Sequence, residues 1–238
     1  MTGVDVFVAS NMPTGYPRKL QKPSTVTPKV RDSAETFILD SGIGEDVSTA
    51  DLLSLADRFD PDFVVAKDVL HDHEATTANI LDIVDRDHPG DLLVPLQPPY
   101  DEHYLTLADH GIDDAKYVLG GMSLPDVGHA ERLRWIRSFR EVAPDVFAHA
   151  LGVGGGIEFV EAVAGTGLID SLDCATPEMA AINGSVLDHR LRQDHVLTFP
   201  GGEGRNRRTY PLAEFNSWQL RDVWRREADG GSDLSAYL

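Results

Sequence analysis

The sequence has a single cysteine, Cys174, few lysines and no long apolar run in its 238 residues. One cysteine excludes a disulfide within the chain and a zinc site built from several thiolates. No apolar segment approaches the roughly 20 residues of a membrane-spanning helix. The first residues also lack the apolar core of a signal peptide. We therefore expect a cytoplasmic protein with no membrane partner, no metal and no cofactor.

Basic residues are scarce, since 21 Lys and Arg stand against 39 Asp and Glu, for a net charge of −18. Such a surface repels itself unless salt screens it. The composition favours a halophile, or a virus of a halophile, as the source. A viral protein would act in the host cytoplasm. An acidic mesophilic enzyme is the alternative. Because salt weakens phosphate contacts, a polynucleotide partner would have to be held by base contacts, shape and local arginines.

The length and the 42% hydrophobic content fit one α/β domain. Short apolar segments alternate with amphipathic helical patterns, which predicts a parallel sheet. The predicted strands are Val4–Ala9, Thr36–Leu39, Phe63–Ala66, Leu92–Leu96, Tyr117–Leu119, Val146–Leu151 and Ile169–Leu172. The predicted helices between them are Ala50–Phe59, Glu74–Val84, Asp101–His110, Ala130–Val142 and Ile157–Ala164.

With an eighth strand expected after Asn183, these elements favour a closed (β/α)8 TIM-like barrel over an open doubly wound sheet. The barrel spans residues 1–238 as a single compact domain. Residues 11–29, rich in Pro, Thr and Lys, predict a long loop over one mouth. Residues 201–238 predict a Gly/Arg loop, a last helix over Leu212–Glu227 and a frayed tail.

Active sites of such barrels lie at the C-terminal ends of the strands, so polar residues at these ends are the candidates. Each of them has a structural alternative, because Asp residues cap helices, amides tie down loops and glycines form tight turns. Their convergence on one mouth favours function. The candidates are Asp40, Ser41, Asp68, Gln97, Gly120, Gly121, the run Gly152–Gly156, and Asp173.

The segment that starts at Asp173 reads Asp-Cys-Ala-Thr-Pro-Glu-Met-Ala-Ala-Ile-Asn-Gly. It resembles the signature of the tRNA-guanine transglycosylases, which has Asp-Cys, then Pro, then Asn-Gly at these spacings. Leu151-Gly152-Val153-Gly154 resembles the family's glycine-rich segment, and Asp40-Ser41-Gly42 resembles its Asp-Ser-Gly strand end. Asp68, Gln97 and Gly120-Gly121-Met122 follow in the family's order. The resemblance spans about residues 36–185.

The resemblance implies that Asp173 attacks C1′ of a guanosine and expels guanine, and that Asp40 is the general acid/base. Carboxylates are known nucleophiles at sugar carbons. A 7-deazaguanine such as preQ1 or preQ0 would then resolve the ester. The same resemblance implies that the base is bound by Ser41, Asp68, Gln97, Gly120, Gly121, the backbone of Met122, Leu151 and Gly152.

The chain departs from the familiar tRNA enzymes in several places. It lacks their zinc site of three Cys and one His, and Met179 and Ile182 stand where the family has arginines that hold tRNA. Ile43-Gly44-Glu45 replaces Gly, an aromatic residue and Gln. The chain is most similar to compact viral relatives that insert 7-deazaguanines into DNA, so DNA is favoured over tRNA. Such relatives are often dimers, which makes a homodimer an expectation.

A cluster of arginines, Arg205, Arg207 and Arg208, is a candidate for contacts to the polynucleotide backbone. A solvated loop is the alternative. Three other functions stay open: the same exchange on tRNA, of queuine or archaeosine type; a phosphate-gripping barrel that uses Gly152–Gly156 on a small metabolite; and a non-catalytic binding subunit.

Overall fold

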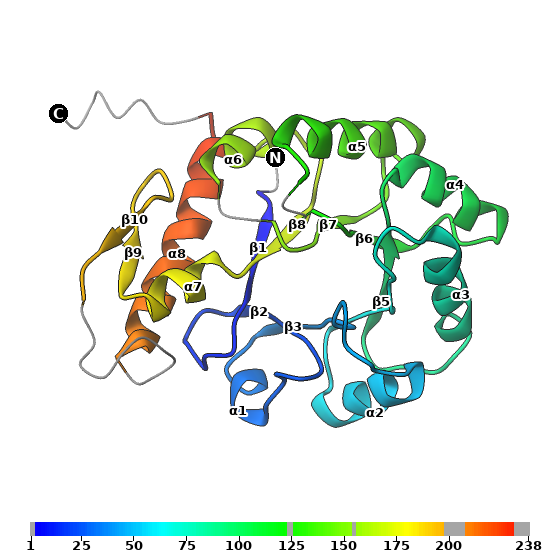
Figure 1. The fold of residues 1–238 in the computed structure, drawn as a ribbon, viewed down its shortest axis with the longest axis horizontal. Coiled ribbons are helices and arrows are strands. Elements are labelled where there is room, and N and C mark those ends of the chain that lie inside the picture. Colours follow the sequence, from blue (N-terminus) through cyan, green and yellow to red (C-terminus); the bar gives the residue numbers. More distant parts are fainter. Residues whose placement is uncertain (1–2, 123–125, 154–155, 198–207, 231–238) are drawn as a thin grey trace.

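The computed structural model describes residues 3–122, 126–153, 156–197 and 208–230. Eight parallel strands form a closed barrel in chain order, and β8 pairs with β1 to close it (Figure 1). The strands are β1 Asp5–Ala9, β2 Arg18–Gln21, β3 Thr36–Leu39, β4 Phe63–Val65, β5 Asp91–Leu96, β6 Lys116–Leu119, β7 Ala148–Ala150 and β8 Ser171–Cys174. The predicted α/β barrel of the (β/α)8 type is confirmed.

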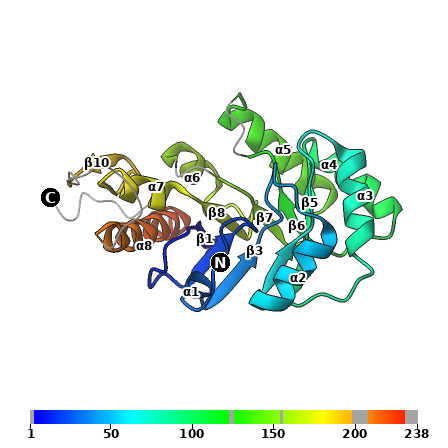
Figure 2. The ribbon, with the colours of Figure 1, turned by 60° about the horizontal axis from the view of Figure 1, so that its bottom comes forward.

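Eight helices accompany the strands in the described part of the chain: α1 Pro28–Arg31, α2 Thr49–Phe59, α3 His73–Ile83, α4 Tyr100–Asp109, α5 His129–Val142, α6 Ile157–Val163, α7 Thr176–Ile182 and α8 Thr209–Ala228. The first six connect consecutive strands from β2 to β8. The described link from β1 to β2 has no helix, and α8 packs against α7 and β1 (Figure 2).

Helix α2 shows how local sequence sets an element. Ser48 caps it: the backbone N–H of Asp51 donates to Ser48 Oγ at 3.1 Å, and the Asp51 carboxylate accepts from the Ser48 backbone. After α4, Gly111 takes the left-handed conformation, with φ 77°, that its position past the helix end predicts. Helix α8 confirms the predicted last helix, while residues 201–207 and 231–238 lie outside the described chain.

The eighth strand was predicted in the wrong place. A strand does follow Asn183, namely β9 (Ser185–Leu187), but it pairs antiparallel with β10 (Gln193–His195) in a separate two-stranded sheet. The missing barrel strand is β2, which lies inside the predicted mouth loop of residues 11–29. That segment therefore holds β2 and, from Pro28, the start of α1, and it is a loop only between and before these elements.

Strand β2 escaped prediction because its sequence, Arg-Lys-Leu-Gln, has one apolar residue. Lys19 is nevertheless fully buried, and its ammonium group donates to the carbonyl oxygen of Thr14 at 2.6 Å and to the carbonyl and hydroxyl oxygens of Ser33. These bonds offset part of the cost of burying a charge, and burial lowers the pKa of Lys19 to about 8. Tertiary hydrogen bonds, which no local pattern reveals, permit this strand.

A layer of apolar side chains fills the barrel interior, contributed by Phe7, Leu20, Ile38, Val65, Leu93, Val118 and Leu151. A larger apolar cluster lies between the strands and the surrounding helices. The barrel is thus a packed core without a pore, as is usual for this fold. A ligand site must lie above this layer, at the C-terminal ends of the strands. In the described part of the chain, no helix has the length and apolar character needed to cross a membrane.

Candidate active site at the C-terminal mouth of the barrel

A pocket of about 540 Å³ opens at the C-terminal ends of the strands. Its lining residues come from the ends of β1, β2, β3, β6, β7 and β8 and from α7. Its lining includes three carboxylates, Asp40, Asp173 and Glu178, and the backbone of Gly121 and Gly152. Asp40 and Asp173 were both predicted from strand ends and lie 133 positions apart in the sequence. The fold brings them together, since both line this cavity.

Asp173 lies within β8, one residue before its end, and is 3% exposed. Its Oδ1 accepts a hydrogen bond from the backbone N–H of Gly152 at 2.7 Å and lies 3.3 Å from Nε2 of His149. Gly152 has φ 66°, a conformation that a residue with Cβ adopts at a cost. This backbone turn after β7 directs its N–H at the carboxylate, and Oδ2 of Asp173 accepts no hydrogen bond from any described residue.

Asp40 follows β3, and its backbone N–H donates to the carbonyl oxygen of Gln21 on β2 at 2.8 Å. Burial of the carboxyl group, with the charges of Asp173 and Asp68 nearby, raises the pKa of Asp40 to about 7. The nearby backbone N–H groups of Gly42 and Ser41 limit this rise in pKa. At neutral pH Asp40 is therefore able both to donate and to accept a proton.

Asp68 and Gln97 form a buried pair behind the pocket. Gln97 Nε2 donates to Asp68 Oδ2 at 2.7 Å, and Gln97 Oε1 accepts from the backbone N–H of His71 at 3.2 Å. Burial raises the pKa of Asp68 to about 6, which the Gln97 hydrogen bond moderates. Gln97 is fully buried and both ends of its amide are in use. In this structure Gln97 holds Asp68 in place, so its expected direct contact with a base would require this pair to open.

Glycine at position 120 is required by the same pair. A Cβ there would lie 2.7 Å from Gln97 Nε2 and 3.3 Å from Asp68 Oδ2. The carbonyl oxygen of Gly120 accepts from the Tyr100 hydroxyl at 2.5 Å, which fixes the backbone at the end of β6. Gly121, with φ 71°, lines the pocket. Gly120 and Gly121 thus let the chain pass close to both the buried pair and the cavity.

The other predicted site residues divide between the pocket and its surroundings. Leu151 lines the cavity with Gly152. Ser41 is buried, and the side chain of Met122 packs in the main core. Arg208 is exposed at the start of α8, whereas Arg205 and Arg207 lie outside the described residues.

Four buried side-chain atoms around the mouth have no hydrogen-bond partner among the described residues: Gln21 Oε1, Asp40 Oδ1, Ser41 Oγ and Asp68 Oδ1. All four belong to the ends of β2, β3 and β4. A buried polar atom without a partner costs about 1–3 kcal/mol, so such a concentration marks a place for a ligand. Gln21 Oε1 and the ionised forms of Asp40 and Asp68 offer acceptors only, which favours a ligand rich in N–H or O–H donors.

Three residues of the site were missed by sequence reasoning. Glu178, 3% exposed in the first turn of α7, accepts from the Ser10 hydroxyl at 2.6 Å and from the Asn11 backbone N–H at 2.7 Å. His149 lies beside Asp173, and Gln21 lies on the unpredicted strand β2. One feature of the sequence could have identified Glu178 and His149: each is a polar residue close to a segment that was predicted to be catalytic.

No family model matches the sequence, and no curated protein matches it. Function therefore has to be inferred from the fold, the geometry of the site and the motifs of the sequence. They define an α/β barrel protein with a carboxylate-lined pocket at the C-terminal ends of the barrel strands. In the described part of the chain, no group of three or more His, Cys, Asp or Glu side chains is placed to hold a metal ion.

Proposed function

We propose that this protein is a base-exchange transglycosylase that replaces guanine in a polynucleotide with a 7-deazaguanine through a covalent bond between Asp173 and the sugar. One observation carries the proposal: Asp40 and Asp173 line the same pocket in opposite environments. Asp173 Oδ1 accepts a hydrogen bond from the backbone N–H of Gly152, whereas burial raises the pKa of Asp40 to about 7. Two carboxyl groups with such divided roles are typical of catalysis at a sugar carbon.

In the first half of the reaction, the Asp173 carboxylate attacks C1′ and the bond from C1′ to N9 of guanine breaks. The bonding electron pair leaves with guanine, and the proton of Asp40 neutralises it. In the second half, Asp40 takes the N9 proton of the incoming base, which attacks C1′ and releases Asp173 from the ester. Protons and charges balance over the cycle, so no metal or cofactor takes part in the proposed steps.

In this proposal the buried acceptor atoms that have no hydrogen-bond partner recognise the base. Guanine and 7-deazaguanines present N1–H and an exocyclic amine on one edge, and Asp68 Oδ1 is an acceptor in need of donors. The backbone of Gly121 would bind the base carbonyl, and Leu151 would pack against the base face. The target nucleotide has to leave a duplex to reach a pocket at this depth, by flipping or from a single strand.

Two features favour this function over the alternatives left open by the sequence. The backbone N–H of Gly152, which a phosphate-gripping loop would need, already donates to Asp173 Oδ1. A non-catalytic binding subunit would use the unpaired acceptors as well, but it has no need of a general acid/base such as Asp40, whose pKa burial raises to about 7. DNA is proposed over tRNA because the chain lacks the zinc insertion and the arginines of the tRNA enzymes that it resembles.

The test is exchange of radiolabelled guanine, and separately of preQ1 and preQ0, into duplex DNA, single-stranded DNA and tRNA in molar salt. Asp173→Asn removes the nucleophile and keeps the side-chain size, while Asp82→Asn makes the same change at an exposed surface position. Incorporation into DNA that Asp173→Asn abolishes and Asp82→Asn leaves intact supports the proposal. Incorporation into tRNA alone reassigns the polymer, and no incorporation by folded protein at any salt concentration refutes base exchange.

A further inference from the structure

His149 is buried in the barrel interior directly below the pocket, with none of its surface exposed. Its ring nitrogens meet two side chains of β8: Nδ1 lies 2.8 Å from Ser171 Oγ, and Nε2 lies 3.3 Å from Asp173 Oδ1. The Phe7 ring of β1 meets the imidazole edge to face, with centroids 5.8 Å apart. The ring is thus held on three sides, and one of its nitrogens faces the proposed nucleophile.

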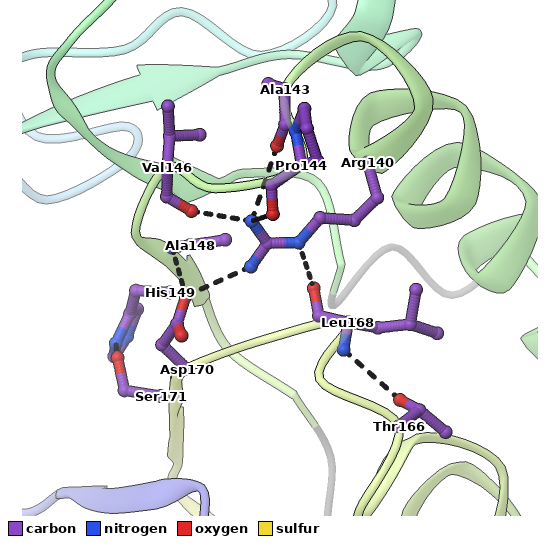
Figure 3. A network of polar contacts seen from close by, with 10 residues as sticks. All are labelled: Arg140, Ala143, Pro144, Val146, Ala148, His149, Thr166, Leu168, Asp170 and Ser171. Carbon is purple, nitrogen blue, oxygen red and sulfur yellow. Dashed lines mark hydrogen bonds and ion pairs between the residues drawn. The ribbon is translucent and has the colours of Figure 1, made fainter. Parts of the chain in front are cut away.

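The register of β7 against β8 creates this arrangement, since His149 pairs directly with Ser171. Just below, Arg140 joins the two strand starts: it donates to the carbonyl oxygens of Val146 and Leu168 and to the Asp170 carboxylate (Figure 3). The same Asp170 oxygen accepts from the Ala148 backbone N–H at 2.8 Å. In Figure 3, His149 and Ser171 follow Ala148 and Asp170 of this network by one residue on each strand. The lower ends of β7 and β8 are fixed, so His149 has little freedom to turn from Asp173.

The two contacts together indicate which ring nitrogen faces an acceptor. A carboxylate oxygen only accepts hydrogen bonds, so the nitrogen facing Asp173 has to carry the hydrogen. The Ser171 hydroxyl is able to donate, and it would then give its hydrogen to the unprotonated Nδ1. Ser171 then donates a hydrogen bond to His149, and His149 donates one to Asp173, so each contact has one donor and one acceptor.

We infer that His149 is a positioning residue for the nucleophile: its Nε2–H and the Gly152 N–H hold Oδ1 of Asp173, which leaves Oδ2 as the oxygen that attacks C1′. The inference rests on the proposed function, because Asp173 attacks only if base exchange occurs. Without the imidazole donor, one backbone N–H remains to fix a carboxylate that is otherwise able to rotate. The attacking oxygen would then spend less time in line with the sugar carbon, which lowers the rate of ester formation.

The decisive variants are His149→Gln and His149→Met, which are matched in length and differ in the terminal amide. Gln places an N–H₂ donor close to the position of Nε2, whereas Met offers none. We expect kcat of His149→Met to fall about ten- to hundredfold, the range for losing one hydrogen bond to a charged group. We expect His149→Gln to recover most of that loss, and KM for the base to stay within about threefold in both. Thermal melting confirms that both variants fold.

A spectroscopic test is independent of activity. The ¹⁵N shifts of the His149 ring, assigned by their absence in His149→Gln, should show hydrogen on Nε2 in the wild type. They should move in Asp173→Asn, and Ser171→Ala should change Nδ1. Hydrogen on Nδ1 alone would overturn the inference. Equal kcat for the Gln and Met variants, in a protein whose exchange requires Asp173, would also overturn it while the proposed function stood. A wild type that exchanges no base refutes the proposed function, whereas the spectra still report on the contact.

Discussion

Replacing Asp40 with Asn should make the protein more stable at alkaline pH while it removes base exchange. Asp40 has an ordinary pKa of 3.8, which burial and the neighbouring charges of Asp173 and Asp68 raise to about 7. The folded protein therefore binds this proton more tightly than the unfolded chain does. Stability from Asp40 is fully present below about pH 4 and is lost as the pH rises through about 7.

The size of the effect follows from the shift. A difference of about three pKa units corresponds to about 4 kcal/mol at a pH above both values, as an order of magnitude. Asn resembles the protonated Asp in shape and carries no charge, so Asp40→Asn does not incur the free-energy cost of a buried charge. The free energy of unfolding of Asp40→Asn should exceed that of the wild type by about 1–2 kcal/mol at pH 5 and by about 4 kcal/mol at pH 8.5.

The assay is urea unfolding in constant molar salt at half-unit steps from pH 5 to 8.5, on the wild type, Asp40→Asn and Asp82→Asn. Thr49 and the Arg86 partner lower the pKa of exposed Asp82, so its variant should show a constant difference over this range. A difference for Asp40→Asn that is equally constant, or that shrinks as the pH rises, would show that Asp40 is ionised throughout. The assignment of Asp40 as the general acid/base would then fail.

Three further changes test the surroundings of the site. Gln97→Met removes the donor to Asp68 Oδ2, so the pKa of Asp68 should rise further and KM for guanine should increase about tenfold; an unchanged KM would contradict the role of this pair. Gly120→Ala adds a Cβ 2.7 Å from Gln97 Nε2 and should lower the melting temperature and weaken base binding, whereas wild-type binding would show that the pair yields freely. Arg140→Met breaks the link to Asp170 and two backbone carbonyls and should lower the unfolding free energy by about 2–4 kcal/mol in urea titrations; a loss under about 0.5 kcal/mol would be inconsistent with this network.

Local sequence was sufficient for the parts of the fold that depend on neighbouring residues. The alternation of strands and helices predicted the closed barrel, and the helix predicted over Ala50–Phe59 agrees with α2 within one residue. Strand ends placed Asp40 and Asp173 at one mouth because the carboxyl ends of parallel strands meet there. Periodicity, caps and strand direction are properties of short segments, and a single sequence carries them in full.

The tertiary structure alone decided the features that depend on distant partners. Strand β2 exists because Lys19 and Gln21 find hydrogen bonds inside the fold, although their side chains suggest a polar loop. The register of β7 and β8 brings His149 to Asp173, and the closure of the barrel brings Glu178 to Ser10. Gln97 is engaged with Asp68 and His71 for the same reason. Sequence spacing specifies which residues reach the mouth, but register and closure specify which of them touch, because contacts between strands depend on how far each is shifted along its neighbour.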